Sequence, residues 1–584
     1  MSISGLLRAI SDDPQLSQAL DHAALRAAGG GDLIAPASLR PILAAALTGY
    51  DADNSKRSGH DDTGAGRFVL AVTATAREAE DLTAALSSLL PPDSVAYFPA
   101  WETLPLERLS PRSDTSGQRL AVLRRLAHPD PADPRTGPLL AVAAPVRSLL
   151  QPMVGGLGDL LPVSLEVGQS VDLEEVVTRL VEIGYARSEL VEKRGDIAVR
   201  GGILDVFPPT EEHPLRVDFF GDEVEEIRYF KVADQRSLEV AETGLWAPPC
   251  RELLLTPAVR GRAKELAAEW PGLGEVLSKL AEGIPVEGME ALAPTLSDRM
   301  ELLLDYVPAG GILVACDPER IRARASDLVA TSQEFLEASW VNAAAGGQVP
   351  IDLGGASFRS ITEVRTSATD LDIPWWTITP FAVTESSVTA GAPDSPQALA
   401  ADEGEPAERP LFAINAEPAP SYRGDTTHVL ADVGRWLSDQ WRVVLITEGH
   451  GPAQRLAELL RAEGVGVAGP GSGALEHAPE PGVASVATGL LEVGFVWPSA
   501  RLAVLAEADM AGSRPGSRQT RRMPSRRRGG IDPLQLTPGD YIVHEQHGVG
   551  RYVEMTSRTV QGATRDYLVI EYAPSKRGHP PDRL

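Results

Sequence analysis

"RFVLAVTATAREAEDLTAALSSLL", residues 67–90, joins an uncharged apolar run to a segment whose apolar residues have helical spacing. A short apolar run without charge is typical of a strand that is covered on both faces of a sheet. Apolar residues that recur every three or four positions are typical of an amphipathic helix. The stretch therefore predicts one strand–helix unit of an α/β fold.

The same strand–helix pattern occurs on both sides of this stretch. It precedes it in "DLIAPASLRPILAAAL" (residues 32–47) and follows it in "PLLAVAAPVRSLLQ" (residues 138–151). Further buried strands are predicted at "GILVAC" (residues 311–316) and "WRVVLITE" (residues 441–448). Strands that alternate with helices imply a parallel sheet with helices on both faces. We therefore expect an α/β multidomain protein.

The period of the apolar pattern changes from helical spacing to alternation at about residue 196. Residues 172–183 ("DLEEVVTRLVEI") have the spacing of an amphipathic helix. From residue 196 the apolar residues alternate, in "DIAVRGGILDVF", in "LRVDFF" and, after a Gly-Asp turn, in "EVEEIRYF". This alternation predicts a small antiparallel meander packed on that helix. Near the end of the chain, "GDYIVHEQHGVGRYVEM" and "RDYLVIEYA" predict a small, partial barrel.

Composition bounds the class of protein. The 584 residues are too many for one hydrophobic core, and 43% hydrophobic with 23% charged residues is typical of a globular protein. Polar breaks lie at 51–66, 391–410 and 512–530, and we expect a loop at the first and linkers at the other two. Apolar runs of membrane-helix length and the apolar core of a signal peptide are missing, so we expect a cytoplasmic protein. Cys250 and Cys316 predict reduced thiols.

The net charge of −27 argues against a non-specific nucleic-acid coat, because phosphate binding is driven by lysine and arginine. The linker 512–530 departs from this charge, since it holds seven arginines and no acidic residue. It is either a solvated, disordered tether or a salt-sensitive contact to nucleic-acid phosphates. The residues of the second alternative are Arg521, Arg522, Arg526, Arg527 and Arg528.

The α/β pattern raises the question of a nucleotide-binding site. A Walker A loop needs a lysine directly after a glycine, because backbone amides cradle the phosphates while that lysine reaches the outer ones. None of the lysines follows a glycine; they are Lys56, Lys193, Lys231, Lys264, Lys279 and Lys576. We therefore expect no ATPase activity from this chain by itself, and we predict neither a catalytic residue nor a cofactor in it.

Two histidines in "HEQH", His544 and His547, raise the question of a metal. They are three positions apart in a β or turn context, whereas the zinc motif of metalloproteases places its histidines at i and i+4 on one helix face. We therefore interpret both as structural residues and predict no metal site.

Three blocks follow one another along the chain: "FPAWETLPLERLSPRSDTSGQRLAVLRRL" (98–126), "RGDIAVRGGILDVFPPTEEHPLRVDFFGDEVEEIRYFKVADQRSL" (194–238), and "LTPGDYIVHEQHGVGRYVEM" with "RDYLVIEYA" (536–573). The first resembles the amino-terminal module of the bacterial transcription-repair coupling factor family. The second resembles the module that this family shares with the excision-repair protein UvrB. The third resembles its RNA-polymerase-interacting domain, a Tudor-like barrel related to the CarD family. The resemblance covers nearly the whole chain.

This resemblance implies a UvrB-like parallel α/β domain with an inserted small antiparallel α+β domain, a further small α/β domain and a partial C-terminal β-barrel. "LIAPASLRP" (33–41) stands where UvrB carries its phosphate loop, so the nucleotide site would be degenerate. The implied segments are the UvrB-like domain in two parts (1–146 and 239–390), the insert (147–238), an acidic linker (391–410), an α/β domain of unknown role (411–511), the arginine-rich linker (512–530) and the polymerase-interacting barrel (531–584).

Members of the family continue into helicase-type motor domains, which use ATP and Mg²⁺ for DNA translocation. Their Walker motifs do not occur in this sequence, and we expect the barrel to be cut before its last strands. We therefore expect a fragment or truncated product. Lacking the family's carboxy-terminal covering domain, it would keep its UvrA-binding face open and compete with UvrB for UvrA.

The resemblance also implies where UvrA binds. In the UvrB pattern the contact is carried by arginines, which match Arg187, Arg194 and Arg200 here, with Gly201 and Gly202 forming a tight turn beside the last one. Arginine suits such a contact because its planar fork binds carboxylates bidentately. The alternative is that these arginines only solvate a strand edge.

For the barrel, the resemblance implies a contact to the β subunit of RNA polymerase, formed by strand addition to an edge. The residues in the matching block are Val543, His544, His547, Gly548, Val549 and Tyr552.

The implied function is an adaptor that binds UvrA and stalled RNA polymerase and directs nucleotide-excision repair to transcription-blocking lesions. DNA would be reached weakly or through these partners, and no membrane is involved. The alternative is a damaged-DNA-binding module like UvrB, which grips DNA with a hairpin rich in aromatic residues. The sequence between residues 60 and 150 carries no such hairpin, which counts against this alternative.

Overall fold

The computed structural model describes residues 2–11, 13–25, 29–50, 67–104, 109–344, 357–381, 409–468, 473–511, 539, 541–544, 548–560, 563–572 and 582–583. The chain divides into a larger unit, Met1–Ser513, and a smaller unit, Arg514–Leu584.

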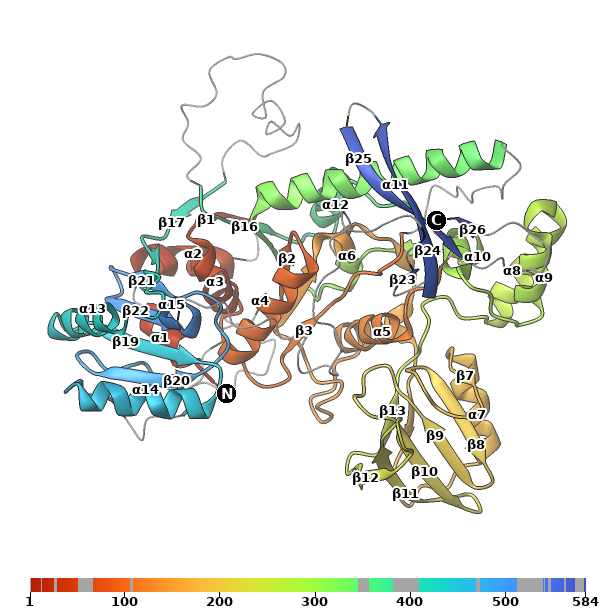
Figure 1. The fold of residues 1–584 in the computed structure, drawn as a ribbon, viewed down its shortest axis with the longest axis horizontal. Coiled ribbons are helices and arrows are strands. Elements are labelled where there is room, and N and C mark those ends of the chain that lie inside the picture. Colours follow the sequence, from red (N-terminus) through yellow and green to blue (C-terminus); the bar gives the residue numbers. More distant parts are fainter. Residues whose placement is uncertain are drawn as a thin grey trace. The chain divides into compact units, whose positions relative to one another are not determined.

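A parallel seven-stranded sheet lies in the larger unit, in the order β17-β1-β16-β15-β2-β4-β3 (Figure 1). Alternate residues of one central strand enter two different cores: Val69 and Ala71 join one core, Leu70 and Val72 the other. This burial on both sides explains the uncharged apolar runs and confirms the predicted α/β fold. The strands are β1 (Asp32–Ile34), β2 (Val69–Thr73), β3 (Val95–Tyr97), β4 (Ala141–Pro145), β15 (Ile312–Cys316), β16 (Trp375–Thr379) and β17 (Leu411–Ala413).

Helices cover both faces of this sheet. Residues of α1 (Gly5–Ile10), α2 (Pro14–Ala24), α3 (Arg40–Leu47) and α4 (Ala76–Leu89) join the first core. Residues of α5 (Ser113–Ala127), α6 (Val146–Leu150), α11 (Pro318–Ala344) and α12 (Ile361–Asp370) join the second. Local sequence sets where α4 begins: Thr75 Oγ1 accepts a hydrogen bond from the Glu78 amide, and the Glu78 carboxylate accepts one from the Thr75 amide. This capping box satisfies two amides that the first helical turn leaves without partners.

A second α/β domain has a five-stranded sheet in the order β18-β21-β22-β19-β20. Its strands are β18 (Glu417–Pro418), β19 (Arg442–Thr447), β20 (Ala484–Thr488), β21 (Phe495–Trp497) and β22 (Leu502–Ala506), with helices α13 (Thr426–Ser438), α14 (His450–Ala462) and α15 (Glu507–Ala511). The expected start of this domain at residue 411 does not match the structure for residues 411–413. They form β17, which pairs with β1 and so belongs to the seven-stranded sheet.

The first residues of the chain connect the two α/β domains. Asp13 is buried, and its Oδ1 accepts a hydrogen bond from the Leu16 amide at the start of α2. Its Oδ2 accepts hydrogen bonds from Trp497 Nε1 at 3.1 Å and from Ser499 Oγ at 2.5 Å. Because a buried carboxylate is costly without such partners, Asp13 fixes the amino-terminal helices to the second domain.

A helical segment precedes β15. It contains α8 (Pro257–Glu269), α9 (Gly274–Ala281) and α10 (Ala293–Leu296), which share a small core of their own. A short antiparallel pair, β5 (Met153–Val154) with β14 (Met300–Glu301), ties this segment to the chain that follows α6.

The inserted region is a six-stranded sheet in the order β12-β11-β10-β9-β8-β7, with α7 (Leu173–Glu182) on one face. The strands are β7 (Ala186–Arg187), β8 (Asp196–Arg200), β9 (Ile203–Val206), β10 (Leu215–Phe220), β11 (Glu223–Phe230) and β12 (Ser237–Val240). The predicted meander and its helix are thus present. The region extends past the expected end at residue 238, because β12 continues the sheet and β13 (Leu245–Ala247) pairs with β6 (Val163–Leu165).

The smaller unit contains a four-stranded antiparallel sheet in the order β23-β24-β25-β26 within its described residues. The strands are β23 (Tyr541–His544), β24 (Gly548–Val560), β25 (Ala563–Tyr572) and β26 (Asp582–Arg583). Tyr552 and Ile570, which pair across β24 and β25, are both buried.

Candidate functional site

The two faces of the six-stranded sheet differ in chemistry. Leu204, Val206, Leu215 and Val217 point to the face covered by α7 and are buried there. Their neighbours in sequence point to the opposite face, where arginine, aspartate and glutamate residues alternate across the strands. One face of the sheet therefore packs on α7, and the other carries these charged residues beside a small apolar cluster of Val191, Ala198, Phe207 and Phe230.

A tight turn brings Arg200 to the end of β8. Arg200 and Ile203 pair across β8 and β9, so the loop has only two residues, Gly201 and Gly202. Gly201 has φ +62°, the left-handed region that hairpin turns of this length require and glycine adopts readily. A Cβ on Gly202 would lie 2.8 Å from the Phe219 carbonyl oxygen, so a side chain there does not fit. The geometry of the turn therefore requires glycine at both positions.

Arg200 and Arg216 converge on one buried carboxylate. Asp205 has no exposed surface, and it lies directly across from Arg216 in the sheet. Arg216 donates from Nε to Oδ1 at 2.7 Å and from Nη2 to Oδ2 at 2.9 Å, while Arg200 donates from Nη2 to Oδ2 at 2.6 Å. The Asp205 carboxylate raises the pKa of Arg216 through these hydrogen bonds. Arg216 also stacks on Phe230, with its guanidinium carbon 4.7 Å from the ring centroid.

An apolar side chain stands at the same end of the sheet. Phe220 is 78% exposed, and the alternation along β10 places it on the same face as Arg216. The Phe219 amide donates to the Gly202 carbonyl at 2.8 Å, so the end of β10 lies beside the turn that follows Arg200. We call Arg200, Asp205, Arg216 and Phe220 together the arginine face.

A second ion pair, Arg228 with Glu226, lies on the same face of this sheet. Arg228 Nη2 lies 2.5 Å from Glu226 Oε1, and both side chains are partly exposed. One cation meets one anion here, so the pair is neutral. At the arginine face two guanidinium groups share the Asp205 carboxylate, and Asp218 on the same face adds a second carboxylate whose charge acts on both Arg216 and Arg228.

The structure brings together only some of the residues expected to form one site. Arg200, Gly201 and Gly202 are adjacent at the turn, whereas Arg187 and Arg194 lie toward the other end of β8, since Arg187 pairs with Ile197. Arg194 donates to the Glu211 carbonyl at 3.0 Å and lies over the Phe207 ring, so it has a structural role. The Arg187 side chain is exposed, and it makes no hydrogen bond or ion pair with the described part of the chain.

Sequence reasoning missed Asp205, Arg216 and Phe220. All three stand in segments that were interpreted only as alternating strands. A charged residue inside an apolar strand was a usable signal, but the pairing of Asp205 with Arg216 depends on the register between β9 and β10.

At the carboxyl ends of β1, β2 and β15, where a nucleotide phosphate would be expected, charged side chains pair with one another. Arg40 Nη2 lies 3.0 Å from Asp317 Oδ2, with side-chain exposures of 16% and 10%. Arg320 pairs with Glu78 and lies 3.9 Å from Asp317. We call these four residues the balanced cluster, because two cations meet two anions. Its guanidinium groups already have anionic partners, and the absence of nucleotide binding stays a prediction.

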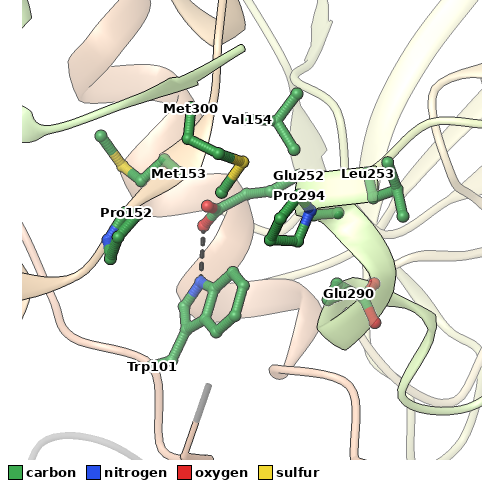
Figure 2. A pocket seen from close by; sticks show the side chains of 10 residues that line it. Trp101, Pro152, Met153, Val154, Glu252, Leu253, Glu290, Pro294 and Met300 are labelled. Carbon is green, nitrogen blue, oxygen red and sulfur yellow. Dashed lines mark hydrogen bonds between the residues drawn. The ribbon is translucent and has the colours of Figure 1, made fainter. Parts of the chain in front are cut away.

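A small pocket beside the insert is lined by Trp101, Met153, Glu252 and Met300, among others (Figure 2). Trp101 Nε1 donates to Glu252 Oε1 at 2.8 Å, and the fully buried Arg119 donates from Nε to the same oxygen at 2.6 Å. The cavity volume of about 10 Å³ is room for one water molecule. It has no space for a substrate.

Both cysteines are free and buried, which confirms the predicted thiols. Burial raises the pKa of Cys316 to about 12 and that of Cys250 further, so neither is a thiolate at neutral pH. Among the described residues, no three His, Cys, Asp or Glu side chains are placed to hold a metal ion. No helix in the described ranges is long and apolar enough to cross a membrane.

Five of the six residues expected to bind RNA polymerase are described, and they lie on two paired strands. Val543 pairs with Val549, and His544 with Gly548, across β23 and β24. Tyr552 lies further along β24 and is buried. His547 and the arginines Arg521, Arg522, Arg526, Arg527 and Arg528 lie outside the described residues.

Comparison with known families agrees with this architecture. The family model described as UvrB interaction domain matches residues 163–248, which span the insert from β6 to β13. The family model described as CarD-like/TRCF RID domain matches residues 536–579, which include β23 to β25. The chain is thus a multidomain α/β protein that carries both of these domains.

Relatives along the whole chain identify its family. The Transcription-repair-coupling factor of Mycobacterium tuberculosis is 44% identical over 99% of this chain and 44% of the relative's length. Proteins of the same name from Myxococcus xanthus (32% identical, 87% of this chain, 42% of the relative) and Bacillus subtilis (26%, 88% and 42%) also match. This chain belongs to the transcription-repair coupling factor family. It spans less than half the length of these relatives and corresponds to their amino-terminal portion.

Proposed function

We propose that this chain is an adaptor in transcription-coupled repair. It binds UvrA through the arginine face and RNA polymerase through the smaller unit, and so directs nucleotide-excision repair to transcription-blocking lesions. The observation that carries the proposal is the arginine face itself: a charged sheet surface within the matched UvrB interaction domain, at which Phe220 and half of the Arg200 side chain are exposed. The name of the relatives supports the coupling of repair to transcription.

The composition of the arginine face suits protein recognition. Arginine and large aromatic residues are enriched among the residues that dominate binding energy at interfaces. Phe220 offers an exposed ring, and the Arg200 side chain is 49% exposed. The half-exposed guanidinium group of Arg200 suits a partner surface that presents a carboxylate, because its planar fork can bind one bidentately.

Calorimetry with purified UvrA tests this half of the proposal. We expect the wild-type chain to bind and Arg200→Glu to bind at least about tenfold more weakly, because the reversed charge meets the partner's carboxylates and lies beside Asp205. Arg236→Glu is the matched control, since it makes the same charge change on an 83% exposed side chain of the same domain. No binding by wild type, or equal losses in both variants, contradicts the proposal.

The polymerase half rests on the smaller unit. Its match to the CarD-like/TRCF RID domain supports a polymerase contact, and β23 is the terminal strand in the sheet order. A terminal strand offers backbone groups for strand addition. Tyr541 on β23 is 79% exposed, so it is available to a partner.

Retention of purified RNA polymerase on the immobilised chain tests this half. We expect Tyr541→Ala to reduce retention several-fold, because exposed tyrosines are frequent interface anchors. The same variant should bind UvrA as wild type does, and Arg200→Glu should retain polymerase. If wild type retains no polymerase, or if both variants lose both partners, two separate binding surfaces are excluded.

A further inference from the structure

Asp205 is a charged group without exposed surface on the face of the insert opposite α7. Taking a carboxylate out of water costs free energy unless it is paired and hydrogen-bonded. Its three hydrogen bonds to Arg200 and Arg216 meet this requirement. The residue itself is out of reach of a partner protein, so any effect it has on binding must pass through the two arginines.

The two arginines are held to different degrees. Arg216 binds both carboxylate oxygens, stacks on Phe230, and is only 18% exposed. Arg200 uses one N–H on Asp205, and its side chain is 49% exposed. Because a guanidinium group has five donors, Arg200 keeps several for a partner while its direction is set by one short hydrogen bond.

We infer that Asp205 is a positioning residue for partner binding: its buried carboxylate holds Arg200 and Arg216 in the orientation in which they receive an acidic group of the partner. Free arginine side chains lose rotamer freedom when a partner immobilises them, at a cost to affinity. Because Asp205 already holds both arginine side chains in the folded protein, most of this loss of rotamer freedom occurs on folding and not on binding. The inference rests on the proposed function of the arginine face.

A double-mutant cycle in UvrA binding tests this inference. We expect Asp205→Asn to weaken binding roughly tenfold in the wild-type background, because one or two arginine side chains must then be ordered on binding. In an Arg200→Ala background the same substitution should cost about threefold or less, since only Arg216 then remains to be positioned. A structural role alone predicts the same loss in both backgrounds, and that result overturns the inference.

Glu226→Gln is the matched control. It makes the same carboxylate-to-amide change on the same face of the sheet, at the neutral pair with Arg228. We expect it to leave binding within about twofold. Wild-type binding with a loss in Arg200→Glu but none in Asp205→Asn would leave the proposed function standing and overturn only this inference; absence of wild-type binding overturns both.

A measurement without substitution covers the case in which Asp205→Asn does not fold. Side-chain ¹⁵N relaxation of the free chain reports the mobility of each arginine Nε–H on the ps–ns timescale. We expect Arg200 and Arg216 to be rigid and Arg236, 83% exposed, to be mobile. An Arg200 side chain as mobile as that of Arg236 overturns the inference.

Discussion

Two arginine–carboxylate groups in the larger unit have similar members and different settings. In the balanced cluster, two cations meet two anions at the carboxyl ends of the parallel strands, and the Arg40–Asp317 pair is largely buried. At the arginine face, two cations share one buried anion, and half of the Arg200 side chain is exposed. Exposure, more than residue type, therefore distinguishes a cluster whose charges pair with one another from one that offers a surface.

The largest loss of unfolding free energy is expected from breaking the balanced cluster. Asp317→Asn removes the carboxylate that faces Arg40 but keeps a residue that tolerates the left-handed backbone there, φ +71°. Leaving a mostly buried guanidinium without its anion should cost about 3 kcal/mol of unfolding free energy. Urea unfolding measures this loss, and UvrA binding should stay unchanged. A loss no larger than that of Glu226→Gln, which breaks the partly exposed pair with Arg228, would contradict the distinction.

At the arginine face, a substitution should weaken binding and leave the unfolding free energy nearly unchanged. Phe220→Ala removes a 78% exposed ring, so the unfolding free energy should change by less than about 0.5 kcal/mol. Binding of UvrA should weaken roughly 30-fold or more, equivalent to about 2 kcal/mol, as for a central aromatic anchor. Calorimetry and thermal unfolding on the same preparation separate the two effects. Substantial destabilisation with unchanged affinity would make Phe220 a structural residue.

The turn beneath Arg200 offers a smaller test. Gly202→Ala would place a Cβ 2.8 Å from the Phe219 carbonyl oxygen, and backbone must shift to accommodate it. We expect a loss of about 1–2 kcal/mol in unfolding free energy and weaker UvrA binding. Gly261→Ala in α8 is the control, because a Cβ added there would meet nothing within 4 Å and alanine favours helix. Equal stability of the two variants would show that the turn is not tightly constrained.

The smallest effect concerns pH. Burial raises the pKa of Glu211 above its ordinary value of 4.5, against a hydrogen bond from Tyr229 and the charges of Arg135 and Arg194. A carboxyl that binds its proton more tightly when folded stabilises fully below pH 4.5, and this contribution is lost as pH rises through the raised folded pKa. Relative to wild type, Glu211→Gln should therefore gain stability between pH 4.5 and 8. Melting temperatures of wild type and Glu211→Gln across this pH range test this prediction. A difference between the two that does not change with pH would contradict it.

The sequence predicted elements better than it predicted the site. The apolar run of β2 and the periodicity of α4 were sufficient for a strand–helix unit, because both depend on near neighbours in the chain. The turn after Arg200 was predictable for the same reason, since two adjacent glycines have few other uses in a hairpin.

The features that the sequence did not predict depend on contacts between residues that are distant in sequence. Asp205 and Arg216 are eleven positions apart and meet only through the register of β9 and β10. Residues 411–413 follow a polar stretch and so suggested the start of a domain, but their pairing with β1 places them in the first sheet. Arg194 had the residue type of a contact residue, yet Phe207 and the Glu211 carbonyl engage its side chain.

The link between Asp13 and Trp497 has a consequence for biosynthesis. The two residues are 484 positions apart. At about 5–20 residues per second, a ribosome needs roughly 25–100 s to reach the second after making the first. Throughout that time the amino-terminal helices lack part of their native contact surface, so the nascent chain depends on chaperones or on transient contacts to keep that surface from aggregating.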